Sequence, residues 1–207
     1  PLPGVVLAHG GGMLFGSIAT EDDVAASVCA DAGVVVVSVG YRLAPEHPYP
    51  AGLDDCYAAL GWLWEGAPSL GVDPSRLAVM GGSAGGGLAL GLALLARDRG
   101  GPPLRFVLAA YPMLDDRNQT PSSHEILDLG VWDRGTNLQA WDCYLGGAPA
   151  DAYAAPARAE DLVGLPPTFI DVGDVDLFRD EDLAFAGRLL QVGVPTELHV
   201  HPGAFHA

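Results

Sequence analysis

Short apolar runs alternate along the chain with longer segments of helical pattern. The runs predict strands at residues 5–8, 33–39, 76–80, 104–110, 168–172 and 196–200. The longer segments predict helices at residues 21–30, 53–64, 84–97 and 181–191. Strands and helices that alternate in this way form a mostly parallel sheet with helices on both faces, which is an α/β fold. The four consecutive valines within residues 33–39 predict a strand that is buried on both faces.

One long stretch interrupts this alternation. Residues 113–165 contain no obvious strand, but they carry Trp132, Trp141, Tyr144 and Tyr153 among prolines and polar residues. Insertions of this length in α/β folds are often lids or binding elements. We therefore expect residues 1–207 to form one domain in which residues 113–165 contain a cap, with the aromatic side chains near Trp132 lining a pocket.

Composition and charge narrow the possible ligands. Of the 207 residues, 49% are hydrophobic and 17% are charged, which excludes a disordered chain. The net charge of −16 arises because the 26 acidic residues outnumber the 10 basic residues, all of which are arginine. No cluster of positive charge is present to bind nucleic acid. The net charge repels anions at long range, so neutral or cationic small molecules are the expected ligands.

The cysteines and the hydropathy pattern bear on location. Cys29, Cys56 and Cys143 lie far apart, and their odd number argues against a disulfide framework. Free thiols are typical of a reducing compartment, so we expect a cytoplasmic protein. No apolar run reaches the roughly 18 residues that a membrane-spanning helix requires.

The strongest local motif is Gly81-Gly82-Ser83-Ala84-Gly85, which fits G-x-S-x-G between a predicted strand and a predicted helix. In that setting the motif forms a nucleophile elbow, a sharp turn that exposes the serine hydroxyl. Small neighbours are needed because the turn is strained and other segments approach it closely. A phosphate-binding loop is the alternative interpretation, but a Walker loop requires a lysine and this chain has none.

A second glycine-rich segment, His9-Gly10-Gly11-Gly12, follows the first predicted strand. Three glycines at this place let the backbone turn and direct N–H groups at a ligand, as in the oxyanion holes of lipases and esterases. Each such donor lowers the barrier of acyl transfer by roughly 3–4 kcal/mol. Two glycine-rich segments with complementary roles indicate acyl-transfer chemistry more strongly than either does alone.

A serine nucleophile requires a histidine base, which must follow it in the order serine, acid, histidine. After Ser83 the candidates are His124, His199, His201 and His206. We predict His206, because it follows the last predicted strand and such loops converge on the active sites of parallel sheets. His199 and His201 alternate on one face and would suit a metal pair, but no convincing third ligand is near.

The acid that orients the base should follow the strand at residues 168–172. Asp171 lies within or at the end of this strand, whereas Asp180 and Glu181 open the next helix, where carboxylates serve as caps. Asp174 and Asp176 remain in the predicted loop, and position alone does not separate them.

Four stretches, in this order, resemble the hormone-sensitive-lipase-like family of bacterial α/β-hydrolase esterases. They are His9-Gly10-Gly11-Gly12, Tyr41-Arg42-Leu43-Ala44-Pro45-Glu46-His47-Pro48, residues 81–86, and residues 176–181 together with 202–206. The resemblance implies an α/β-hydrolase fold. The family pattern Asp-Pro-Leu-Arg-Asp-Glu aligns on residues 176–181, which selects Asp176 as the acid, and the implied triad is Ser83, Asp176 and His206.

The resemblance also implies that the backbone N–H groups of Gly11, Gly12 and Ala84 form the oxyanion hole, and that residues 41–48 are mainly structural. Gly82 stands where the family often has Asp, and Leu177 where Pro is frequent; neither departure touches the chemistry. Family members also carry a segment before the first strand and continue past the catalytic histidine. We therefore expect this chain to lack an N-terminal cap segment and a C-terminal helix.

The function that the motifs and the resemblance predict is that of a serine carboxylesterase. Such an enzyme hydrolyses small neutral esters with short acyl chains through an acyl-enzyme, without a metal or cofactor. An amidase or arylacetamide deacetylase with the same triad is one alternative. A non-catalytic small-molecule receptor on the same fold is another. The expected partner is a small ester rather than nucleic acid or a membrane, and a homo-oligomer is possible.

Overall fold

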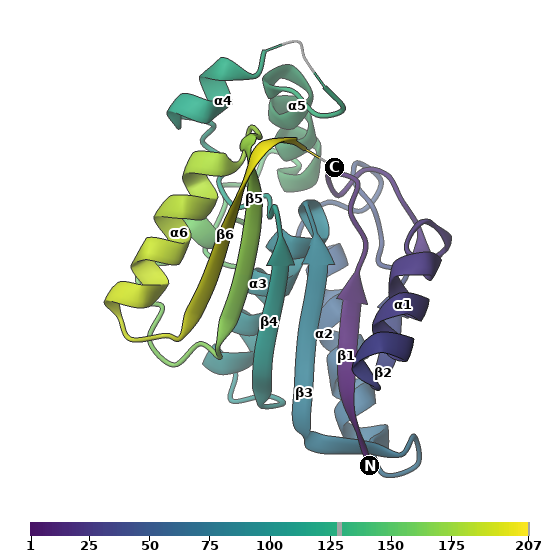
Figure 1. The fold of residues 1–207 in the computed structure, drawn as a ribbon. Helices are drawn as coiled ribbons and strands as arrows, with labels where there is room; N and C mark the ends of the chain where they lie inside the picture. Colours follow the sequence, from purple (N-terminus) through teal and green to yellow (C-terminus); the bar gives the residue numbers. More distant parts are fainter. Residues whose placement is uncertain (128–129, 207) are drawn as a thin grey trace.

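The computed structural model describes residues 1–127 and 130–206 (Figure 1). Within these residues, six parallel strands form one sheet in the order β2-β1-β3-β4-β5-β6. The strands are β1 (Leu2–Ala8), β2 (Val35–Val39), β3 (Val72–Gly82), β4 (Leu104–Ala110), β5 (Thr168–Val175) and β6 (Thr196–Phe205). Each includes residues from one of the predicted apolar runs, so the prediction of a parallel sheet is confirmed.

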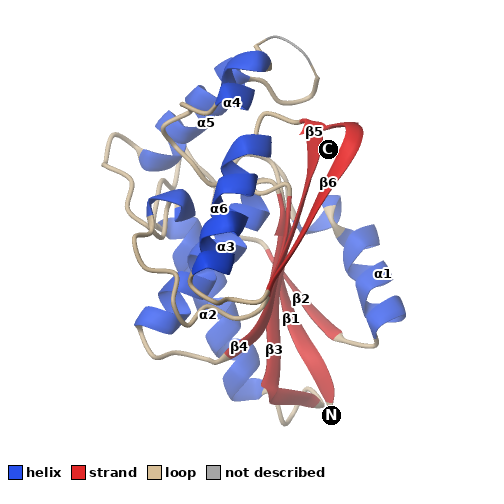
Figure 2. Ribbon diagram, turned by 60° about the vertical axis from the view of Figure 1, so that its left-hand side comes forward, coloured by secondary structure: helices blue, strands red, loops and turns tan. Residues whose placement is uncertain are grey.

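Helices cover both faces of the sheet, as predicted (Figure 2). On one face lies α1 (Asp22–Ala32), and on the other lie α2 (Ala51–Gly66), α3 (Ala84–Asp98) and α6 (Arg179–Gln191). The larger part of the hydrophobic core belongs to α2, α3, α6 and the sheet. A smaller cluster around Val5, Leu7 and Met80 includes side chains of α1. None of the described helices is both long enough and apolar enough to cross a lipid bilayer.

The central helix is α3, which contacts β1, β3 and β4. All of its residues from 84 to 96 are buried, and they are only glycine, alanine and leucine. A helix surrounded by protein needs no polar face, which explains why this segment shows no amphipathic pattern. Because α3 begins at the residue after Ser83, its burial fixes that turn at the carboxyl end of β3.

One expectation about the strands is wrong. β2 is an edge strand of the described sheet and pairs only with β1 there. Its residues 35–38 are half-buried, and only Val39 is fully buried. A run of valines indicates a strand with apolar surroundings, but the number of neighbouring strands depends on the order of the sheet.

The stretch at residues 113–165 contains two helices, α4 (Pro121–Glu125) and α5 (Arg134–Leu145), and a 3-10 turn at Pro156–Arg158. Residues 128 and 129 lie outside the described part, and no strand occurs in the rest of the stretch, as the sequence predicted. Thr120 caps α4 by accepting from the N–H of Ser123, and Asp133 caps α5 in the same way from Thr136. Both helices lie beyond the carboxyl ends of β5 and β6 (Figure 1).

Candidate active site

Ser83 occupies the turn between β3 and α3. Its φ of 55° and ψ of −120° are strained for a residue with a side chain. The backbone is held in this conformation from both sides. The N–H of Ser83 donates to the carbonyl of Ala110 at 2.9 Å, and the Ser83 carbonyl accepts from Met113 at 3.0 Å. The predicted nucleophile elbow is therefore present as a turn, with its serine at the carboxyl edge of the sheet.

Gly85 illustrates why the motif requires small residues. A Cβ atom at Gly85 would collide with the backbone carbonyl of Ala8, at the end of β1, and would lie 2.7 Å from the carbonyl of His9. The first turn of α3 thus packs directly on the chain that leads into the glycine-rich loop. This close approach brings the two glycine-rich segments of the sequence together.

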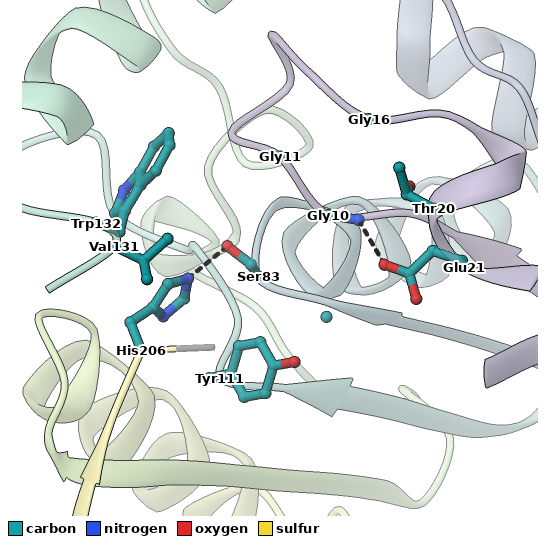
Figure 3. A pocket seen from close by; sticks show the side chains of 11 residues that line it. Gly10, Gly11, Gly16, Thr20, Glu21, Ser83, Tyr111, Val131, Trp132 and His206 are labelled. Atoms are coloured by element: carbon teal, nitrogen blue, oxygen red, sulfur yellow. Dashed lines mark hydrogen bonds between the residues drawn. The ribbon is translucent and has the colours of Figure 1, made fainter. Parts of the chain in front are cut away.

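Three side chains from three different loops form a hydrogen-bonded chain. Ser83 Oγ lies 2.9 Å from His206 Nε2, and His206 Nδ1 lies 2.9 Å from Asp176 Oδ2 (Figure 3 shows the first of these contacts). Exposure is 8% for Ser83, 6% for His206 and 1% for Asp176. A carboxylate only accepts, so Nδ1–H donates to Asp176, and Nε2 is left to accept the serine proton. The three residues predicted as a triad are thus brought together.

The imidazole is also held by packing. The rings of Tyr111 and Phe178 meet it edge-on, with centroids 5.2 and 5.0 Å away. Phe178 is fully buried and follows Asp176 by two residues, and its N–H donates to Asp176 Oδ1 at 2.9 Å. One short segment therefore supplies both the carboxylate that is hydrogen-bonded to His206 and one wall around its ring.

His206 reaches Ser83 because β6 departs from regular pairing. Gly173 of β5 pairs with His201, and Val175 of β5 pairs with Phe205. Between these two pairs, β6 advances by four residues whereas β5 advances by only two. Gly203 lies in this bulge with a φ of 76°. An extra length of strand bends the chain end, and the residue after β6 is His206.

The structure distinguishes Asp174 from Asp176, the two candidate acids that sequence position alone did not separate. Asp174 lies within β5, which is longer than predicted, and its Oδ1 accepts from the N–H of Gly203 at 2.7 Å. Asp176 lies just beyond the strand and faces His206. Among the other histidines, His199 pairs with Glu197 at 2.7 Å and His201 with Asp171 at 3.3 Å.

The remaining candidate, His124, is exposed on α4 and has no place in the chain from Ser83 to Asp176. In the described residues, no group of three or more histidine, cysteine or acidic side chains is placed to hold a metal ion.

The glycine-rich loop after β1 lies beside Ser83. Gly11 and Gly12 have φ values of 111° and 61°, which side chains rarely permit, and a Cβ at Gly12 would collide with the indole of Trp132. Within the described residues, the N–H groups of Gly11, Gly12 and Ala84 donate to no other protein group. The arrangement therefore presents a serine hydroxyl, a histidine acceptor and uncommitted backbone donors to one space.

The sequence matches the protein family described as "alpha/beta hydrolase fold" over residues 5–207. The chain belongs to this family.

Relatives of known name support the same assignment. Carboxylesterase NlhH of Mycobacterium tuberculosis is 46% identical over 213 residues, which cover 99% of this chain and 66% of the relative. Bacterial heroin esterase has a TM-score of 0.98 at 44% identity, and esterase LipW from Mycobacterium marinum one of 0.97 at 45%. This chain is covered completely in both structures and spans 68% and 65% of them. The resemblance to hormone-sensitive-lipase-like esterases is confirmed.

Residues of the stretch 41–48 support the site of this α/β hydrolase. The Tyr41 hydroxyl donates to the carbonyl of His9 at 2.8 Å, and the two rings stack with centroids 4.1 Å apart. The N–H of Ala44 donates to the carbonyl of Met13 at 3.0 Å. The segment that includes Tyr41 and Ala44 thus holds both ends of the glycine-rich loop, in agreement with the structural role implied for residues 41–48.

Asp180 and Glu181 lie in the first turn of α6, as predicted, but the expectation that they cap this helix is wrong. Glu181 is buried, and its Oε1 accepts from the backbone of Leu114 at 2.7 Å and of Asp115 at 3.1 Å. Asp180 Oδ2 accepts from the N–H of Ser122 in α4 at 2.8 Å. Burial raises the pKa of Glu181 well above its usual range, against the effect of its two backbone donors. Both carboxyl groups join α6, next to the Asp176 loop, to the stretch that follows β4.

Asp182, the next residue of α6, is a second buried acidic residue near the Asp176 loop. It is fully buried, and within the described residues neither of its oxygens has a hydrogen-bond partner. Burial, followed by the charges of Glu181, Asp176 and Asp171, raises its pKa well above the ordinary 3.8. The folded state therefore retains a proton that the unfolded chain releases, and the free energy of unfolding falls as pH rises from about 4 toward the folded-state pKa.

We expect Asp182→Asn to stabilise the protein at neutral pH. The amide keeps the shape but cannot ionise in the unfolded chain, so the free energy of unfolding should rise by about 1–3 kcal/mol at pH 7. The gain should shrink toward pH 4, as measured by urea unfolding at several pH values. Asp142→Asn, at an exposed position of α5, is the control and should change stability by less than about 0.5 kcal/mol. A gain that does not vary with pH would contradict this explanation.

A cavity of about 300 Å³ opens beside the serine. Its walls include Gly10 and Gly11 of the loop, Ser83 and His206, and the side chains of Glu21, Tyr111, Val131 and Trp132 (Figure 3). The predicted position of Trp132 in a pocket wall is thus observed. Tyr111 and Glu21 could not be assigned to the pocket from the sequence, because turns separate each of them from the motifs. The path of such turns cannot be predicted from the pattern of hydrophobic and polar residues.

Proposed function

We propose that this α/β hydrolase is a carboxylic ester hydrolase of the serine type. The observation that carries the proposal is the hydrogen-bonded chain from Ser83 through His206 to Asp176, placed at a strained turn beside backbone donors. The named relatives are carboxylesterases or esterases, which supports the same reaction class.

The proposed reaction begins when His206 Nε2 takes the Ser83 proton while Oγ attacks the ester carbonyl carbon. The carbonyl π bond breaks, and its electron pair moves to the oxygen. The N–H groups of Gly11, Gly12 and Ala84 stabilise this oxyanion. When the carbonyl forms again, the alkoxide leaves and takes the proton from His206. Water then attacks the acyl-enzyme in the same way, which releases the acid and restores Ser83. Asp176 keeps the proton on Nδ1 and stabilises the imidazolium.

The pocket supports small esters without negative charge as substrates. Its volume of about 300 Å³ is at the lower end of ligand sites, and the net charge of −16 opposes anions. Trp132 comes from the stretch at residues 113–165 and packs on Gly12, which places a rigid wall beside the proposed oxyanion donors. We propose that this stretch acts as a cap that limits the length of the acyl chain.

Hydrolysis of p-nitrophenyl esters from acetate to laurate by the full-length protein tests this proposal. We expect the highest kcat/KM for short chains and a shift toward longer chains in Trp132→Ala, because the indole no longer closes the pocket. Trp64→Ala on the exposed side of α2 is the matched control. An unchanged chain-length profile in Trp132→Ala would exclude the role of the indole. Absence of any hydrolysis, together with no labelling of Ser83 by an organophosphate, would instead favour a receptor.

A further inference from the structure

Glu21 places a carboxylate in the wall of the proposed ester pocket. The residue is the N-cap of α1, yet its side chain makes no capping hydrogen bond. Instead, Oε1 accepts from the N–H of Gly10 at 3.4 Å, so the carboxylate lies against the glycine-rich loop (Figure 3). The pocket thus contains an acidic side chain that neither the triad nor the backbone donors require.

Among the residues that the structure describes, no positive side chain forms an ion pair with this carboxylate. The chain has no lysine, and within the described residues every ion pair of an arginine or histidine involves another acidic group. The N-terminus of α1, where Glu21 is the N-cap, supplies only partial positive charge, which amounts to a fraction of one charge. A half-buried carboxylate without a counter-ion favours a cationic ligand.

The aromatic side chains of the pocket fit the same ligand. Tyr111 and Trp132 line the cavity together with Glu21, and aromatic faces bind ammonium groups through their quadrupole. Burial, and after it the charge of Glu21, raise the pKa of the Tyr111 phenol, so Tyr111 stays neutral and adds no competing charge. A carboxylate with two aromatic rings in a small cavity is a suitable surrounding for an ammonium or quaternary ammonium group.

We infer that Glu21 makes this pocket select esters that carry an ammonium group close to the ester bond. The inference rests on the proposed esterase function and names the substrate class of the same site. The ammonium group can belong to the alcohol or to the acyl part of the ester, since the chemistry that recognises it is the same. Glu21 is then a specificity-determining residue, because its contribution depends on the charge of the substrate.

Two pairs of isosteric esters test the inference in the full-length protein. Acetylcholine and 3,3-dimethylbutyl acetate differ only in a nitrogen or a carbon atom in the alcohol. The ethyl esters of trimethylammonioacetic acid and 3,3-dimethylbutanoic acid differ in the same way in the acyl part. The measured quantity is the ratio of kcat/KM, cationic over neutral. Comparing this ratio between variants cancels the intrinsic reactivity of each ester and any general loss of catalysis.

We expect Glu21→Gln to lower this ratio roughly fivefold to tenfold for at least one pair, as for a partly screened ion pair. The pair that responds identifies the part of the ester that lies near Glu21. Glutamine still accepts the hydrogen bond from Gly10, so a purely structural role of Glu21 would leave both ratios unchanged. Glu65→Gln, at an exposed position of α2, removes the same charge outside the pocket and should leave the ratios at the wild-type value.

The outcomes separate this inference from the proposed function. Hydrolysis with equal ratios in the wild type and Glu21→Gln overturns the role of Glu21 and leaves the esterase proposal intact. Equal losses in Glu21→Gln and Glu65→Gln also overturn it, because the effect would then come from net charge alone. A protein that hydrolyses p-nitrophenyl acetate but none of the four esters overturns this inference alone. A protein that hydrolyses neither and takes no organophosphate label at Ser83 refutes the proposed function, and this inference with it.

Discussion

Ser83→Ala is expected to lower the kcat for p-nitrophenyl acetate by several orders of magnitude. The hydroxyl is the group within 2.9 Å of His206 Nε2, so its removal leaves the base without a nucleophile to activate. The backbone donors and the pocket remain in the variant. Residual catalysis should therefore stay at roughly 10³–10⁴-fold over the uncatalysed reaction, as in other triad enzymes. Initial rates measured at saturating substrate give the comparison.

The matched control for this prediction is Ser69→Ala. Ser69 is exposed, and its hydroxyl donates only to the nearby carbonyl of Gly66. We expect this variant to retain the wild-type kcat and to be labelled once by an organophosphate, whereas Ser83→Ala should not be labelled. If Ser83→Ala folds normally and keeps more than a tenth of the wild-type kcat, the proposed nucleophile is wrong.

Asp176→Asn should lower kcat by about 10⁴-fold, because triads depend on the tautomer of the histidine. The wild-type carboxylate accepts from Nδ1–H at 2.9 Å and leaves Nε2 free to accept the serine proton. An asparagine amide can donate to Nδ1 instead, which moves the imidazole proton to Nε2. The histidine then faces Ser83 with a donor and cannot take its proton. Single-turnover kinetics with p-nitrophenyl acetate measure the acylation step directly.

Asp174→Asn provides the comparison two residues away. Asp174 accepts from the N–H of Gly203, whereas the imidazole of His206 is hydrogen-bonded to Ser83 and Asp176. Its substitution removes the same negative charge from the same region, so a general electrostatic effect of the loop would appear in both variants. We expect Asp174→Asn to change kcat by less than about tenfold. Comparable losses in the two variants would refute the specific role of Asp176.

Local features of the chain determined most of the fold and the two catalytic motifs. The apolar runs predicted the strands, because an apolar run of this length favours a strand whatever its neighbours in the sheet are. Gly85 and Gly12 were recognisable because a tight turn packed against another segment admits no side chain. Ser83 and His206 followed from their positions after strands, since the carboxyl ends of parallel strands share one edge of the sheet. The choice of Asp176 required the family resemblance.

Other properties were decided only when distant segments came together. β2 became a half-buried edge strand through the order of the sheet, which its own valines do not encode. Glu181 and Asp182 lie at the start of a predicted helix, where carboxylates usually serve as caps. In the structure both are buried against other segments, and this burial decides which hydrogen bonds their carboxyl groups form. Tyr111 and Glu21 enter the pocket from different parts of the chain. Their roles depend on distances across the fold, and the periodicity of a sequence reports only which face of its own element a residue occupies.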